Sequence, residues 1–333
     1  MSKPDPRFVT IKNNQELILQ MISELVLEPR LNAIKWSKIT KQTPNIKIGY
    51  PGQHLASLIT GMDGERTGAR GNDLIDGSEV KSCSRIDQLD LCKTCGHSVA
   101  RLEETCSSCG SEKIERKNDS KWLISVRNED DLEVLLNQVG RVLLMLGDYP
   151  NFDEGDFETL RIQAFEIWPR EERHHRFSEI MTNYYRKIYL AHRKNSPTKT
   201  PAPKNFWPYS YQFYICNPVK VFSCIITKAN TAPQIIIEHY SEPAQDRSKI
   251  ASEPMPSAIL TDVEIQNLVQ KLNQDEAQEI TSLKIDLKEL KAKQGAELKS
   301  LIPLIPEKYK AYLELRDTDK ISVAKNKYSR RKN

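Results

Sequence analysis

The stretch from residue 71 to residue 82 constrains the chain most, because it gathers charged side chains at the start of a predicted sheet. Its sequence, Gly-Asn-Asp-Leu-Ile-Asp-Gly-Ser-Glu-Val-Lys-Ser, predicts two short strands around a glycine turn, with Asp73 on the first strand. Side chains alternate between the two faces of a strand. Glu79 and Lys81 on the second strand therefore share one face, while Val80 points into the core. Two carboxylates and an amine are thereby expected at one place.

This set of side chains can hold a divalent cation and position a water molecule for phosphodiester hydrolysis. Asp73 and Glu79 provide the oxygen ligands that Mg²⁺ prefers, and the carbonyl of Val80 could be a third ligand. Lys81 could orient the water or stabilise charge that develops on the phosphate. The alternative is a surface hairpin with a salt bridge. The Glu-x-Lys spacing alone does not decide between them, because it recurs at 289–291 and 297–299 in predicted helix.

The same region resembles the PD-(D/E)XK nuclease superfamily, and most closely its MutH-like members and type II restriction endonucleases. The resemblance extends over about residues 50–170 and implies that Asp73, Glu79 and Lys81 form the catalytic triad. The matching residues are Gly52, Gln53, Gly61, Asp73, Gly77, Ser78, Glu79, Val80, Lys81 and Ser82.

Two positions depart from the pattern of that superfamily. Asn72 replaces the usual proline before the aspartate, and Ala56 replaces a glutamate that often follows the Gly-Gln helix position. Gln53 could support the site in place of that glutamate, and Glu65, in a predicted loop, is a second candidate.

Two Cys-x-x-Cys-Gly segments lie in a polar stretch, residues 84–118, which we interpret as an insertion. The start of the chain lacks the pattern of a secretory signal, so paired cysteines favour a metal site over disulfides. Four thiolates satisfy the tetrahedral preference of Zn²⁺ and leave no open position, which predicts a structural zinc ribbon. The predicted ligands are Cys92, Cys95, Cys106 and Cys109.

Basic residues in two regions are candidates for DNA contacts. One region is the insertion, where a purely structural role is the alternative. The other is a predicted helix over 171–194, whose charges could equally form a solvated face. The candidates are Arg101, Lys113, Arg116, Arg173 and Arg176.

The order of predicted elements indicates a mixed α/β fold, with a restriction-endonuclease-like mixed sheet flanked by helices and a C-terminal region of helices and strands. We divide the chain into a helical segment (1–45), a catalytic core (46–170) and a DNA-binding or dimerisation region (171–333). The predicted helices are two within 12–41 and one each over 52–61, 130–146, 171–194, 261–293 and 306–315. The predicted strands are 122–126, 159–168, 209–215, 219–226 and 234–240, with an exposed proline-rich loop over 196–204.

The 333 residues include 38% hydrophobic and 28% charged residues, with a net charge of +4, as expected for a soluble protein that tolerates a nucleic-acid partner. No apolar run is long enough to span a membrane, which suggests a prokaryotic cytoplasmic protein. We therefore expect a Mg²⁺-dependent type II restriction endonuclease that cuts double-stranded DNA as a homodimer. The alternatives are a MutH-like nicking or repair nuclease and a noncatalytic zinc-ribbon protein that binds nucleic acid.

Overall fold

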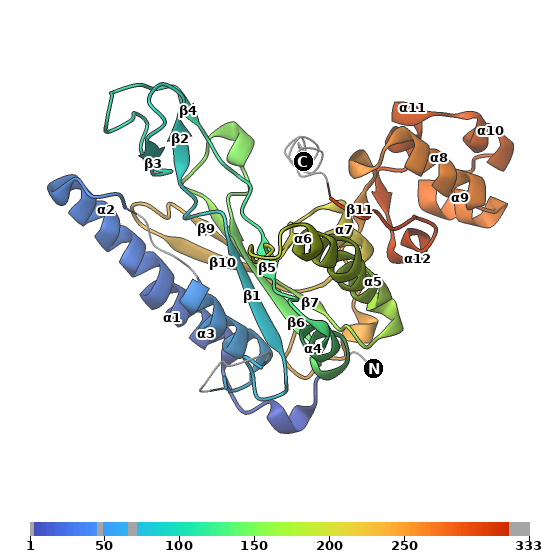
Figure 1. Cartoon of the computed structure of the whole chain (residues 1–333), viewed down its shortest axis with the longest axis horizontal. Helices are drawn as coiled ribbons and strands as arrows, with labels where there is room; N and C mark the ends of the chain where they lie inside the picture. Colours follow the sequence, from blue (N-terminus) through green and yellow to red (C-terminus); the bar gives the residue numbers. More distant parts are fainter. Residues whose placement is uncertain (1–2, 45–48, 66–71, 320–333) are drawn as a thin grey trace.

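A five-stranded mixed sheet forms the centre of the protein in the computed structural model, which describes residues 3–44, 49–65 and 72–319. Its strands lie in the order β1-β6-β7-β9-β10 (Figure 1). β1 and β6 are parallel, and the other neighbours are antiparallel. The strands are β1 (Glu79–Ser84), β6 (Val142–Asp148), β7 (Leu160–Ile167), β9 (Val219–Thr227) and β10 (Gln234–Tyr240). The mixed α/β fold predicted from the sequence is confirmed, and the sheet takes its last two strands from beyond residue 170.

Helices cover both faces of this sheet (Figure 1). Ile18 of α1 and Ile59 of α3 pack in one hydrophobic cluster with Leu143, whereas Phe177 of α5 packs in a second cluster with Leu144. The helices on the two sides are α1 (Asn14–Ile22), α2 (Glu28–Thr40) and α3 (Gly49–Thr60), and then α4 (Glu129–Glu133), α5 (His175–Asn183), α6 (Leu190–Asn195) and α7 (Tyr211–Ile215). The helical layers hold β1 in a fixed position between them.

The two helices predicted within 12–41 are present as α1 and α2. A π-helical segment, Ser23–Leu27, joins α1 to α2, and all three segments keep helical backbone angles. Pro29 lies in the first turn of α2, where a proline is tolerated because its missing amide needs no intrahelical partner. A similar π-helical segment, Tyr184–Tyr189, joins α5 to α6, so the predicted helix over 171–194 is confirmed in outline.

The predicted helix over 130–146 is wrong in its second half. Helical structure ends at Gln138, where a π-helical segment that starts at Val134 stops, and Val142–Asp148 forms β6. Every residue of β6 is buried, because Val142, Leu144 and Leu146 face one cluster while Leu143 and Met145 face the other. A strand that is covered on both faces shows no alternation, and its apolar run therefore imitates a buried helix.

Two further predictions about strands are corrected by the structure. Within the predicted strand 209–215, residues 211–215 form the short helix α7, because the Ser210 hydroxyl accepts a hydrogen bond from the Phe213 amide and caps the helix. The predicted strand at 122–126 exists as β5 (Trp122–Ile124), but it pairs with β8 (Lys204–Phe206) outside the central sheet. The Trp122 indole N–H donates to the carbonyl of Met145, which attaches this small sheet to β6.

The C-terminal region is broken into short helices, so the single helix predicted over 261–293 is also wrong. Capping side chains start new helices at Asn273 and Asp286. The elements are α8 (Asp262–Lys271), α9 (Gln274–Thr281), α10 (Leu287–Ala292), α11 (Gly295–Leu301) and α12 (Glu307–Lys310), with β11 (Met255–Pro256) paired to β12 (Leu304–Ile305).

The predicted insertion folds as a small three-stranded sheet that projects beyond the end of β1 (Figure 1). Its strands are β2 (Asp90–Cys92), β3 (Ser98–Val99) and β4 (Ile114–Glu115). We call residues 84–118 the cysteine module. In the part of the chain that is described, no helix combines the length and apolar character needed to cross a membrane.

Candidate active site and cysteine centre

Asp73 lies in a turn immediately before β1, and not on a strand as predicted. The amides of Asp73 and Leu74 both donate to the carbonyl of Ser78, at 2.8 and 3.2 Å, and these bonds close the turn. Gly77 makes the turn possible, because its φ of 80° is unfavourable for residues with a side chain. Gly71, at the start of the predicted hairpin, lies outside the described residues.

The turn brings Asp73 to the start of β1. One carboxylate oxygen of Asp73 accepts a hydrogen bond from the Val80 amide at 2.7 Å, and the other accepts one from the Gln53 side chain at 3.2 Å. Four predicted site residues, Asp73, Glu79, Lys81 and Gln53, are therefore clustered. Glu65 is nearby through its backbone, since its amide donates to the carbonyl of Asp73 at 2.9 Å.

Close packing of α3 against β1 places Gln53 at the site. A Cβ atom on Gly52 would clash with the hydroxyl of Ser82, so any larger residue would require the Ser82 side chain to move. Ala56, where the family pattern often has a glutamate, is fully buried in the core. Its position faces the sheet and not the carboxylates.

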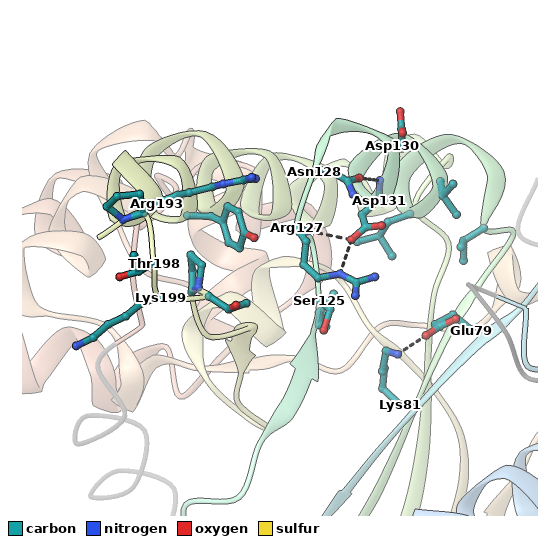
Figure 2. Close-up of a pocket in the computed structure, with 18 residues that line it drawn as sticks. Glu79, Lys81, Ser125, Arg127, Asn128, Asp130, Asp131, Arg193, Thr198 and Lys199 are labelled. Carbon is teal, nitrogen blue, oxygen red and sulfur yellow. Dashed lines mark hydrogen bonds and ion pairs between the residues drawn. The ribbon is translucent and has the colours of Figure 1, made fainter. Parts of the chain in front are cut away.

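Glu79 and Lys81 point to the same side of β1, and Val80 is buried, as the alternation predicts. The ammonium of Lys81 contacts the carboxylate of Glu79. Both side chains line a cleft of about 900 Å³ that opens between β1, the segment around α4 and the loop after α6. Figure 2 shows this pair on one side of the cleft, with Arg193 and Lys199 on the other.

A buried ionic network, which the sequence did not suggest, supports the turn that carries Asp73. The Arg141 guanidinium donates to the Ser78 hydroxyl at 2.9 Å, to Asp76 at 2.7 Å and to Glu166 at 2.9 Å. The Nε of Arg247 donates a hydrogen bond to the other carboxylate oxygen of Glu166 at 3.2 Å. Burial alone would raise the pKa of Glu166, but the guanidinium groups of Arg247 and Arg141 outweigh burial and lower that pKa below its usual value.

The four predicted cysteine ligands converge in the cysteine module. Their sulfur atoms all lie within 4.8 Å of one another. Cys92 and Cys109 are 3.7 Å apart, and Cys95 and Cys106 are 3.6 Å apart. Zn–S bonds of about 2.3 Å in a tetrahedron place the sulfurs about 3.8 Å apart, so the cluster has the size of a zinc site. A disulfide would require about 2.0 Å.

Backbone amides favour a thiolate in this cluster. Hydrogen bonds from the amides of Cys95 and Thr94 lower the pKa of Cys92 to about 6. The module therefore offers a charged sulfur ligand near neutral pH, as metal binding requires.

Two of the predicted DNA-binding arginines join the cysteine module to the core. Arg101 pairs with Asp90 at 2.8 Å while its guanidinium lies 4.8 Å and 5.0 Å from the ring centres of Phe152 and Phe157. Arg116 pairs with the second oxygen of Asp90 at 2.8 Å. The third candidate of the module, Lys113, is exposed.

The other two candidates, on the 171–194 segment, also make intramolecular contacts. Arg173 binds Glu307 through two nitrogens and donates to the carbonyls of Arg247 and Ile250. Arg176 pairs with Glu179 and donates to the carbonyl of Leu313. These contacts hold the C-terminal helices against α5, and they occupy the groups that a phosphate would need.

The central mixed sheet between helical layers, with charged side chains at the start of its edge strand, is the restriction-endonuclease-like arrangement expected from the sequence. A family model described as MamI restriction endonuclease matches residues 35–258, about two thirds of the chain. The protein therefore belongs to the MamI restriction endonuclease family.

A segment of 70 residues is 39% identical to the type II restriction enzyme MamI of Microbacterium ammoniaphilum. It covers 21% of this chain and 22% of that relative, so the match spans about a fifth of the relative's length. No solved structure matches the chain.

Proposed function

We propose that this protein is a type II restriction endonuclease that hydrolyses phosphodiester bonds at a specific site in double-stranded DNA. The observation that carries the proposal is the cluster of Asp73, Glu79 and Lys81 around the start of β1, where Glu79 and Lys81 line a cleft, in a chain of the MamI restriction endonuclease family. The arrangement supports assignment to the PD-(D/E)XK superfamily.

The residues of the cluster fit a Mg²⁺ site by their chemistry. The carboxylates of Asp73 and Glu79 and the carbonyl of Val80 are hard oxygen donors. The Val80 amide and the Gln53 side chain orient the Asp73 carboxylate through hydrogen bonds. When bound, Mg²⁺ would screen the phosphate charge and lower the pKa of a water ligand.

Lys81 supplies the only positive charge that the described part of β1 contributes to the cleft. Its side chain is 28% exposed, and the ammonium group lies beside Glu79 and can donate to a water molecule or to a phosphate oxygen. In hydrolysis the oxygen of this water bonds to phosphorus, the water releases one proton to solvent, and one P–O bond of the DNA backbone breaks. The departing oxygen then takes a proton from solvent.

The experiment is incubation of supercoiled plasmid DNA with the protein, with and without Mg²⁺. We expect discrete linear fragments only when Mg²⁺ is present. Glu79→Gln and Asp73→Asn should each lower the rate about 100-fold or more, in proportion to the loss of a positioned charged group. Rates equal to that of the unchanged protein would refute the assignment, and nicked circles would indicate a nicking enzyme instead.

We also propose that the four cysteines hold one structural Zn²⁺. The sulfur spacing supports this proposal, and the lack of an open ligand position excludes a catalytic role for this ion. The purified protein should contain one zinc per chain, and Cys106→Ala should contain much less while retaining the central sheet by circular dichroism. A full zinc content in Cys106→Ala would contradict the assignment.

A homodimer completes the proposal, because a two-fold symmetric enzyme matches the symmetry of a palindromic DNA site. Light scattering of the protein in the absence of DNA should give a mass of about twice 38.3 kDa. A stable monomer that still produces double-strand cuts would refute this part.

A further inference from the structure

The wall of the cleft that faces away from β1 carries basic side chains without an assigned role. Arg127 precedes α4, Arg193 lies on α6, and Lys199 lies in the loop that follows α6. We call these three residues the basic wall. Arg127 is more than 60 positions from Arg193 and Lys199 in the chain, so the fold brings it to them and a single charged helix face does not explain the group.

Arg127 is oriented before any ligand binds. Its Nε donates to the Asp131 carboxylate at 2.9 Å, and its backbone amide donates to the same oxygen at 3.0 Å. Asp131 is itself fixed, because its amide donates to the Asn128 side chain at 2.7 Å. The side chain of Arg127 is 62% exposed, and Figure 2 shows its guanidinium projecting into the space above Glu79 and Lys81. A guanidinium held at one edge presents its remaining nitrogens to a ligand at low entropic cost.

Arg193 approaches from the opposite side. Figure 2 shows its side chain extending from α6 toward the start of α4. Among the described residues, neither Arg193 nor Lys199 forms an ion pair, and both are exposed. Pro197 and Pro201 restrict the backbone of the loop that carries Lys199.

The charges in the cleft are arranged for an anionic chain. Glu79 is neutralised by Lys81 and Asp131 by Arg127, which leaves Arg193 and Lys199 opposed only by Asp130 among the charged lining residues. Planar guanidinium groups match two phosphate oxygens at once.

We propose that Arg127 and Arg193, with Lys199, bind backbone phosphates of the DNA strand that lies against Glu79 and Lys81. The inference rests on the proposed function for the identity of the ligand. The phosphate contacts are thereby assigned to side chains of the cleft. Arg173 and Arg176 are not assigned this role, because their guanidinium groups hold the C-terminal helices against α5.

The test is the salt dependence of DNA binding by Arg127→Ala/Arg193→Ala. The probe is a fluorescently labelled duplex of arbitrary sequence and about 30 base pairs, without Mg²⁺, at KCl concentrations from about 50 to 200 mM. Each lost phosphate contact lowers the slope of log affinity against log salt by about 0.9. The double variant should therefore show a slope that is smaller by about 1.8.

The matched control is Arg186→Ala/Lys194→Ala, which removes two exposed positive charges from the same helical stretch but outside the cleft lining. Its slope should stay close to that of the unchanged protein. Equal slopes for the unchanged protein and Arg127→Ala/Arg193→Ala, or an equal reduction in the control, would overturn the proposal. All variants should unfold at the same temperature, because the four side chains are exposed.

This result is separable from that of the plasmid assay. If the double variant loses slope as expected while the unchanged protein fails to cut DNA with Mg²⁺, the cleft binds DNA and the catalytic assignment fails. If the plasmid is cut but the slope is unchanged, the catalytic assignment stands and the basic wall has no role in phosphate binding.

Discussion

Arg141→Met tests whether the buried network positions Asp73 and Glu79, the carboxylates proposed to be catalytic. Arg141 is fully buried and donates charge-assisted hydrogen bonds to Ser78, Asp76 and Glu166. Its backbone carbonyl also accepts the Glu79 amide at 2.9 Å. Methionine keeps most of the side-chain volume but removes the hydrogen bonds to these three residues. The turn that carries Asp73 then loses its support from the residue that precedes β6.

The cost to stability follows from these contacts. Removing one partner of a buried ion pair costs about 3–5 kcal/mol. Glu166 keeps Arg247, and the Asp76 side chain is 11% exposed, so water replaces part of what is lost there. We therefore expect a loss near the lower limit, about 3 kcal/mol, in the free energy of unfolding measured with guanidinium chloride.

Arg247→Met separates lost stability from lost positioning. Arg247 is equally buried and binds the other oxygen of Glu166, but its remaining bonds go to the carbonyls of Glu242 and Gln245, away from the turn. At a temperature where both variants are folded, Arg141→Met should cleave DNA about 10- to 100-fold more slowly and Arg247→Met should cleave at nearly the normal rate. Arg141→Lys should recover part of the rate. Equal rates for the two methionine variants would refute the positioning role.

Two further outcomes follow from buried groups. Arg101→Met should loosen the cysteine module from the rings of Phe152 and Phe157, which faster proteolysis within 84–118 would reveal. The salt dependence of DNA binding should stay unchanged. A smaller slope of log affinity against log salt would instead support the DNA contact predicted for Arg101. Burial lowers the pKa of His174 from 6.5 to about 4. The Nδ1 of His174 forms a hydrogen bond with the Cys216 carbonyl at 2.9 Å, and its Nε2 is buried without a hydrogen-bond partner in the described structure. The unfolded chain then binds more protons between these pH values, so stability is complete above about pH 6.5 and falls by about 3 kcal/mol as the pH drops to 4. His174→Gln should flatten this pH dependence in denaturation experiments, and an unchanged profile would contradict the assignment to His174.

Local patterns in the sequence predicted the parts of the site that depend on local geometry. The alternation along β1 correctly placed Glu79 and Lys81 on one face and Val80 in the core, because that geometry belongs to the strand itself. The Cys-x-x-Cys pairs likewise gave the converging sulfurs, since each turn brings its own two together. The strand at Val142–Asp148 was missed because its residues are buried on both faces, a fact that only the assembled layers determine.

Long-range pairing explains why the DNA contacts could not be assigned from the sequence. Arg173 is 134 positions from Glu307, and nothing near it in the chain indicates that its guanidinium is occupied. Arg127 and Arg193 are no more basic in their local context than Arg176 or Arg186. Only the fold shows which arginines line the cleft and which join helices, so a count of basic residues along a helix does not locate a phosphate site.

The position of Ala56 shows why the missing helix glutamate does not weaken the site. Ala56 is fully buried beside Leu55 and Ile59, so a carboxylate there would be desolvated against the sheet. Gln53, one turn earlier and exposed, is the helix residue whose side chain reaches Asp73. An amide can hold that carboxylate by donating to it, whereas a second carboxylate at the same place would repel it in the absence of a cation. In the proposed site, the helix therefore orients the Asp73 carboxylate, and the oxygens that would bind Mg²⁺ come from the turn and from β1.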